Sequence, residues 1–146
     1  MTHRLYTRAR DTEETHLVFL GYSGSLDCVK MVTDENYVTG GDGGLHPLWF
    51  NGRKKPMCVI SIEHGGKWVG SVVVMPRTDL IASESSGAES VHRSGGQIRL
   101  WQADLQDRTL TVVAPIQLKG FGNALFFDRK ARVLVEGELG SGRNAR

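Results

Sequence analysis

The most constraining feature of this 146-residue sequence is a unit that recurs. From Gly21 the chain reads a glycine beside an aromatic residue, an apolar run, a polar turn, a glycine-rich turn and then "LHPLWF" with Trp49. From His64 the same order returns, with a longer loop before "QIRLW" and Trp101. A third start at Gly120 has no tryptophan after it. Such a period is typical of a repeat protein, in which each unit packs against its neighbours.

Each unit reads as several short strands separated by turns. In the first unit we expect strands at Leu26–Val32, Tyr37–Thr39, Leu45–Phe50 and Met57–Ile62. No window has a helical period. Four short strands in about 45 residues, with a glycine-aromatic start and a tryptophan end, are typical of one WD-repeat blade. The expected fold class is therefore all-β, a WD-repeat β-propeller, with "QIRLW" as the third strand of its blade.

The sequence predicts only part of a propeller, about two whole blades and two half blades. Residues 1–20 read as the end of one blade, 21–62 as a blade, 63–118 as a blade with a loop insertion and 119–146 as an incomplete blade. Propellers close with about four to eight blades. An isolated copy is therefore expected to expose two sheet edges, so the chain is either a fragment of a longer protein or one of several copies that complete a ring.

The polar signature of the blades is degraded. Gly43 stands where a blade usually has its turn aspartate, and Tyr22 and Phe121 stand where a blade usually begins with histidine. We therefore expect the histidine-aspartate-tryptophan hydrogen-bond network to be missing in every unit, so that blade stability depends on packing. The aromatic residues expected in or near the core are Trp49, Trp101, Phe121, Phe126 and Phe127. The exposure of Trp68 is left open.

Composition excludes several classes of protein. The net charge of +2 and the pI near 8.7 permit RNA binding without implying it. Cys28 and Cys58 lie in apolar, β-branched runs, which is typical of buried free thiols in a reducing compartment. The basic start is followed by "DTEETH" where a signal peptide needs an apolar run, and no long apolar run follows. Neither secretion nor membrane insertion is expected.

Catalysis, cofactor binding and metal binding are not expected either. Cys28 lies inside a predicted strand, and the sequence shows no base oriented toward it. The two cysteines do not combine with His46 and His64 into a paired zinc pattern. The glycine-rich "GGDGG" lacks the frame of a phosphate-binding loop. The sequence therefore predicts a protein that is not an enzyme.

Basic residues recur in turns that a propeller brings to one face. The turns between first and second strands and between third and fourth strands share that face, and the basic residues expected there are Arg53, Lys54, Lys55, Arg77, Arg129 and Lys130. Such a cluster is suited to neutralising phosphates. Acidic residues lie in the same turns, so ordinary solvated turns are the alternative interpretation. On the opposite face, Lys67 and Arg93 are candidates for contact with a partner, although a polar, glycine-rich loop such as the one around Arg93 is often simply mobile.

The phrases "GSLDCV", "TDLIASES" and "GFGNALFF" resemble the carboxyl-terminal blades of the WD-repeat proteins of the U3 small nucleolar ribonucleoprotein. The resemblance extends from about Leu17 to Gly137. It implies a nucleolar scaffold in ribosomal RNA processing, with small nucleolar RNA and ribonucleoprotein proteins as partners. Two alternatives stay open: a generic WD-repeat platform for protein interactions, and a truncated product without an independent role.

Overall fold

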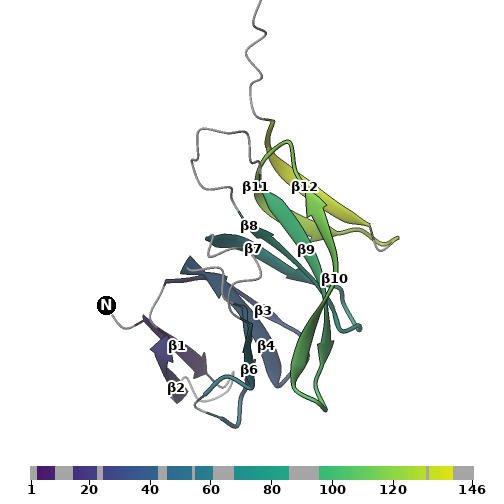
Figure 1. Cartoon of the computed structure of the whole chain (residues 1–146). Coiled ribbons are helices and arrows are strands. Elements are labelled where there is room, and N and C mark those ends of the chain that lie inside the picture. Colours follow the sequence, from purple (N-terminus) through teal and green to yellow (C-terminus); the bar gives the residue numbers. More distant parts are fainter. Residues whose placement is uncertain are drawn as a thin grey trace, which may run out of the picture.

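The computed structural model describes residues 3–8, 15–22, 25–42, 46–53, 55–60, 68–85, 96–130 and 132–139. The strands of these residues pair antiparallel (Figure 1). Two sheets have four strands each. The first runs in the order β3 (Leu26–Met31), β4 (Asn36–Gly41), β5 (His46–Phe50) and β6 (Cys58–Ile60), and the second in the order β7 (Val69–Val74), β8 (Leu80–Ser85), β9 (Gln97–Asp104) and β10 (Thr109–Gln117).

Two further sheets have two strands each. One pairs β1 (His3–Arg8) with β2 (Thr15–Tyr22), and the other pairs β11 (Gly120–Phe127) with β12 (Val133–Leu139). In every sheet the strands follow one another in chain order, as they do in a propeller blade. The all-β architecture of two four-stranded and two two-stranded sheets is the one that the repeat predicts, and "QIRLW" forms the start of β9, the third strand of its sheet.

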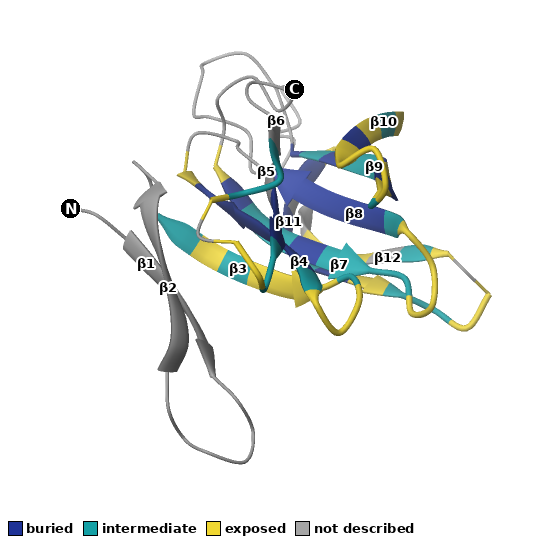
Figure 2. Cartoon of the chain, turned by 90° about the horizontal axis from the view of Figure 1, so that it is seen from below, coloured by how far each residue is buried: buried dark blue, intermediate teal, exposed yellow. Residues whose placement is uncertain are grey.

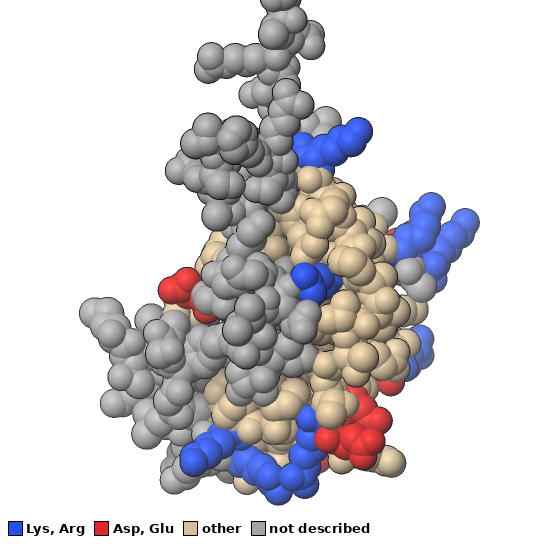
Figure 3. Space-filling model, in the orientation of Figure 1, with Lys and Arg blue, Asp and Glu red and all other residues tan. Residues whose placement is uncertain are grey.

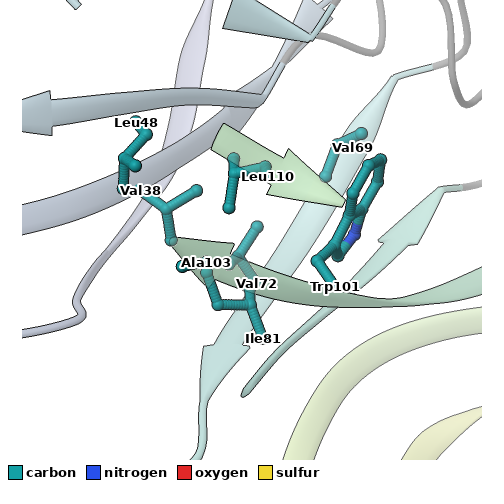
Figure 4. Close-up of a cluster of buried hydrophobic side chains, with 8 residues drawn as sticks. All are labelled: Val38, Leu48, Val69, Val72, Ile81, Trp101, Ala103 and Leu110. Carbon is teal, nitrogen blue, oxygen red and sulfur yellow. The ribbon is translucent and has the colours of Figure 1, made fainter. Parts of the chain in front are cut away.

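The sheets pack face to face around their inner strands, because β7 contacts β3 on one side and β11 on the other. The core between the first two sheets is apolar, and Figure 4 shows its side chains meeting from both sheets. Its buried members are Val38, Leu48, Val69, Val72, Ile81, Trp101, Ala103 and Leu110. A second cluster, Ala82, Ile98 and Leu125, lies between the second sheet and β11. Figure 2 shows β8, which lies between these clusters, as buried over most of its length, from Ile81 to Ser85.

Each tryptophan of the two complete sheets is buried and donates a hydrogen bond to a hydroxyl group. The Trp49 Nε1 donates to Thr39 Oγ1 at 3.0 Å, and the Trp101 Nε1 donates to Ser83 Oγ at 2.7 Å. Thr39 and Ser83 hold equivalent places in β4 and β8. The expectation that blade stability depends on packing was therefore incomplete, since each complete sheet also has this polar contact across its strands.

A small residue opposes a larger one where neighbouring sheets meet. A Cβ atom added to Gly40 would lie 2.8 Å from both Cys28 Sγ and Val69 Cγ1, so β4 leaves room there for side chains of β3 and β7. In the second sheet the place of Gly40 is taken by Glu84, and the facing residue of β11 is Gly122. A Cβ atom on Gly122 would lie 2.9 Å from Glu84 Cγ. The extra volume on one side is thus offset by a glycine on the other.

Phe126 and Trp68 are both partly exposed to solvent. Phe126 is 51 % exposed, which corrects the prediction that it lies in or near the core. Residues alternate along a strand, and because Leu125 and Phe127 face the second sheet, Phe126 points to the other side of β11. The side chain of Phe121 lies outside the described residues. Trp68 is 46 % exposed, and its Nε1 donates to Asp27 Oδ2 at 2.6 Å, which ties the start of β7 to β3.

Candidate functional site

Among the residues that the structure describes, five turns lie at the same end of their sheets and form what we call the turn face. Alternate turns of an antiparallel meander lie at opposite ends, so the first-to-second and third-to-fourth turns share one end. The turns of this face comprise residues 32–35, 51–57, 75–79, 105–108 and 128–132. Figure 3 shows Lys and Arg side chains along the lower and right-hand edges of the molecule, where several of these turns lie in Figure 1.

The structure places most of the predicted basic residues on this face. Arg53 and Lys55 are exposed in the turn between β5 and β6, and Arg77 is exposed between β7 and β8. Arg129 and Lys130 are exposed between β11 and β12. The remaining predicted candidates, Lys54, Lys67 and Arg93, lie outside the described residues.

Sequence reasoning missed two basic residues of the turn face. Arg108 ends the turn between β9 and β10, and Arg132 ends the turn between β11 and β12. The signal for Arg108 was present in the sequence, because "LQDR" at residues 105–108 is a mostly polar segment between two strands.

The turn face has mixed charge with a basic excess. Its described residues include seven basic and five acidic side chains, the acidic ones being Asp34, Glu35, Asp79, Asp107 and Asp128. Arg132 forms an ion pair with Asp128 at 2.6 Å. Hydrogen bonds from the Arg132 backbone and side chain lower the pKa of Asp128. Among the described residues, Arg53, Arg77 and Arg108 form no such pair, so their charge is presented to solvent.

Two arginines of this face occupy backbone conformations that favour glycine. Arg77 has a φ of 62° and follows Pro76, and the Thr78 N–H donates to the Met75 carbonyl at 3.2 Å. These are the features of a type II turn, whose third position usually holds glycine. Arg108 has a φ of 58° as the last residue of its turn. Non-glycine residues are uncommon in this region of conformational space.

A hollow of about 230 Å³ opens on the turn face between the first two sheets. We call it the inter-blade hollow, and it is lined by Asn36, Phe50, Arg53, Met57, Leu105 and Arg108. Its walls come from β4, β5, the turn after β5 and the turn after β9. The hollow therefore combines apolar side chains with the side chains of two arginines.

The two cysteines are not activated for nucleophilic chemistry. Burial raises the pKa of the Cys28 thiol to about 11 and also raises the pKa of Cys58, so neither is a ready thiolate nucleophile at neutral pH. Among the described residues no group of three histidine, cysteine, aspartate or glutamate side chains is arranged to hold a metal ion. The described part of the chain also contains no helix with the length and hydropathy that crossing a membrane requires.

Comparison with known proteins places the chain among WD40 proteins. No family model matches it. The U3 small nucleolar RNA-interacting protein 2 of Mus musculus is 36 % identical over 134 residues, which cover 86 % of this chain and 26 % of that protein. Ribosomal RNA-processing protein 9 of Saccharomyces cerevisiae is 42 % identical over 55 residues, which cover 38 % of this chain and 9 % of that protein. The chain thus spans about a quarter of the length of the mouse relative.

The solved structures agree with the sequence matches. The crystal structure of the RRP9 WD40 repeats superposes with a TM-score of 0.73 at 32 % identity, over 92 % of this chain and 42 % of that one. This similarity confirms the predicted all-β propeller class, and the resemblance to the U3 ribonucleoprotein family is confirmed with it. The chain is a WD40-repeat protein related to U3 small nucleolar RNA-interacting protein 2 and RRP9, and it covers part of a propeller.

Proposed function

We propose that the chain is a non-catalytic scaffold of the U3 small nucleolar ribonucleoprotein, which associates with U3 small nucleolar RNA during ribosomal RNA processing in the nucleolus. The observation that carries this proposal is the 36 % identity, over 86 % of the chain, to a protein named for its interaction with that RNA. The name of the yeast relative supports a role in ribosomal RNA processing. Fold alone would not support this function, because propellers serve many.

The turn face is the surface that best suits RNA. Arginine and lysine side chains from separate turns neutralise phosphates and release counterions, and Arg53, Arg77 and Arg108 present their charge to solvent. The acidic residues of the same face limit this attraction, so we expect contacts at particular phosphates and not general adhesion to nucleic acid. Proteins of the ribonucleoprotein are the other expected partners.

A second copy of the chain is a further proposed partner. The β11–β12 pair has the position of the two inner strands of a blade, because β11 packs against β7 and β8. The β1–β2 pair precedes the first complete sheet, in the position of the two outer strands. Joining β12 of one copy to β1 of another would complete a four-stranded sheet, and two such joints would give a six-bladed ring, within the usual range of about four to eight blades.

Crosslinking in cells tests the proposed function. Cells that express the tagged chain are irradiated with ultraviolet light, the chain is purified under denaturing conditions, and the bound RNA is sequenced. We expect enrichment of U3 small nucleolar RNA, which falls in the variant Arg53→Glu/Lys55→Glu. It should persist in Lys119→Glu, which reverses an exposed charge at the opposite end of the sheets. Recovery of proteins without small nucleolar RNA would contradict the proposal and favour a generic interaction platform.

A further inference from the structure

The backbone of the two turns that line the inter-blade hollow is fixed by hydrogen bonds within the chain. The Asn51 N–H donates to the Glu35 carbonyl at 2.9 Å, and the Arg53 N–H donates to the Phe50 carbonyl at 3.0 Å, which together fix the turn after β5. Across the hollow, Asp104 Oδ1 accepts hydrogen bonds from the Gln106 and Asp107 N–H groups. The backbone of these turns therefore loses little conformational entropy on binding.

The lining of the hollow has two chemical parts. Phe50, Met57 and Leu105 supply apolar and aromatic surface, and Arg53 and Arg108 supply guanidinium groups. Gly52 lies against the Phe50 ring, since a Cβ atom there would be 2.5 Å from Phe50 Cε1. This combination suits a ligand that has a flat apolar part beside an anionic part. An RNA nucleotide has both, because its base stacks on aromatic side chains and its phosphate accepts hydrogen bonds from arginine.

The size of the hollow favours a single unpaired base. Its 230 Å³ is smaller than the usual site for a drug-sized molecule. A base within a double helix is stacked and paired, whereas unpaired bases of RNA can turn outward into such a site. Long stretches of duplex are therefore excluded from the hollow itself.

Arg108 is kept in a backbone conformation that glycine or asparagine would adopt more readily. Its φ of 58° is independent of any argument about charge. Strained positions of this kind cluster at functional sites, where the side chain has a use that offsets the strain. The use that the structure offers Arg108 is its place in the lining of the hollow, which Arg53 also lines.

We infer that the inter-blade hollow binds one nucleotide of single-stranded RNA, with the base against Phe50 and the neighbouring phosphate between Arg53 and Arg108. This inference rests on the proposed association with RNA and names the place on the turn face where a base is held. The chain then distinguishes unpaired RNA from duplex RNA by whether a base can enter.

Two glycine variants test the assignment as a matched pair. Arg108→Gly and Arg77→Gly each remove one arginine of the turn face and each relieve a positive φ, so both should keep or raise the melting temperature. The probe is a single-stranded oligouridylate of about twelve nucleotides with one 4-thiouridine. We expect Arg108→Gly to raise its Kd about tenfold and Arg77→Gly to raise it no more than about threefold. Light-induced crosslinks should fall between Phe50 and Met57 in the wild-type chain and disappear in Arg108→Gly.

The outcomes separate the hollow from the proposed function. Equal losses of affinity in the two variants, with crosslinks elsewhere, would overturn the assignment of the nucleotide to the hollow. The proposed association with RNA would then still stand. Absence of any RNA binding by the folded wild-type chain would overturn both. An acidic peptide such as oligoglutamate that binds with the same dependence on Arg108, in the absence of RNA binding, would identify the hollow as a peptide site instead.

Discussion

At the scale of single residues, Glu84 is the least expected feature of the chain. It is 1 % exposed between β8 and β11, and its Oε1 accepts one long hydrogen bond from the Gly122 N–H at 3.3 Å. Its Oε2 has no hydrogen-bond partner among the described residues. Burial raises the pKa of Glu84 to about 7, because the charged form loses its hydration. The carboxyl group is therefore most compatible with the fold when it is protonated.

This pKa predicts how stability depends on pH. In the folded chain Glu84 keeps its proton up to about pH 7, whereas the unfolded chain releases it near 4.5. The contribution of Glu84 to the free energy of unfolding should therefore be most favourable below about pH 4.5. It should fall by on the order of 3 kcal/mol as the pH rises to 7. Urea unfolding across this range should show that slope in the wild type and in Glu136→Gln, and a flatter one in Glu84→Gln. Equal slopes in all three chains would contradict the assignment.

The burial of Glu84 was not accessible from the sequence. A glutamate in "IASES" reads as an ordinary polar residue of a strand. What buries it is Gly122, which lies 38 residues further along the chain and only opposes it once the sheets pack. The position of Arg108, in contrast, could be predicted from the sequence, because the strand patterns on either side of it indicate a turn.

At the scale of strands, the tryptophan-hydroxyl contact holds each complete sheet together across two neighbouring strands. Ser83→Ala removes the acceptor of the buried Trp101 indole N–H, and we expect it to lower the free energy of unfolding by about 1–2 kcal/mol. Thr111→Ala in the exposed face of β10 is the control and should change stability much less. Both are measured by urea denaturation at one pH. A Ser83→Ala chain as stable as the control would show that packing alone sustains the sheet.

Most of the strands could be predicted from the sequence, because turn residues mark their ends. The expected strand at Leu26–Val32 becomes β3, Leu26–Met31, and that at Leu45–Phe50 becomes β5, His46–Phe50. Phe126 was mispredicted because alternation identifies two faces of a strand without saying what covers each. The inter-blade hollow could not be predicted from the sequence either, since residues from 36 to 108 meet there only through the packing of two sheets.

At the scale of the whole molecule, apolar side chains are exposed on the first complete sheet and on the β11–β12 pair. Val29 and Met31 of β3 are exposed on the first, and Phe126 of β11 is exposed on the second. Val72 of β7 and Leu125 of β11 occupy the position that Val29 occupies in β3. Unlike Val29, each of them is buried against the sheet that precedes its own. We expect light scattering to give the mass of a dimer, and Phe126→Glu to shift it to monomer or aggregate. A folded, monodisperse monomer would contradict pairing between copies.

The most direct test of RNA recognition by the turn face is the dependence of binding on salt. The purified chain is titrated with single-stranded RNA at several salt concentrations, beside Arg53→Glu/Lys55→Glu and Lys119→Glu. Contacts with a few phosphates predict that log K falls with log salt at a slope of about −2 to −4, which becomes shallower by about 1 or more in the double variant and changes little in Lys119→Glu. A slope near zero, or equal slopes in all three chains, would contradict recognition of RNA by this face.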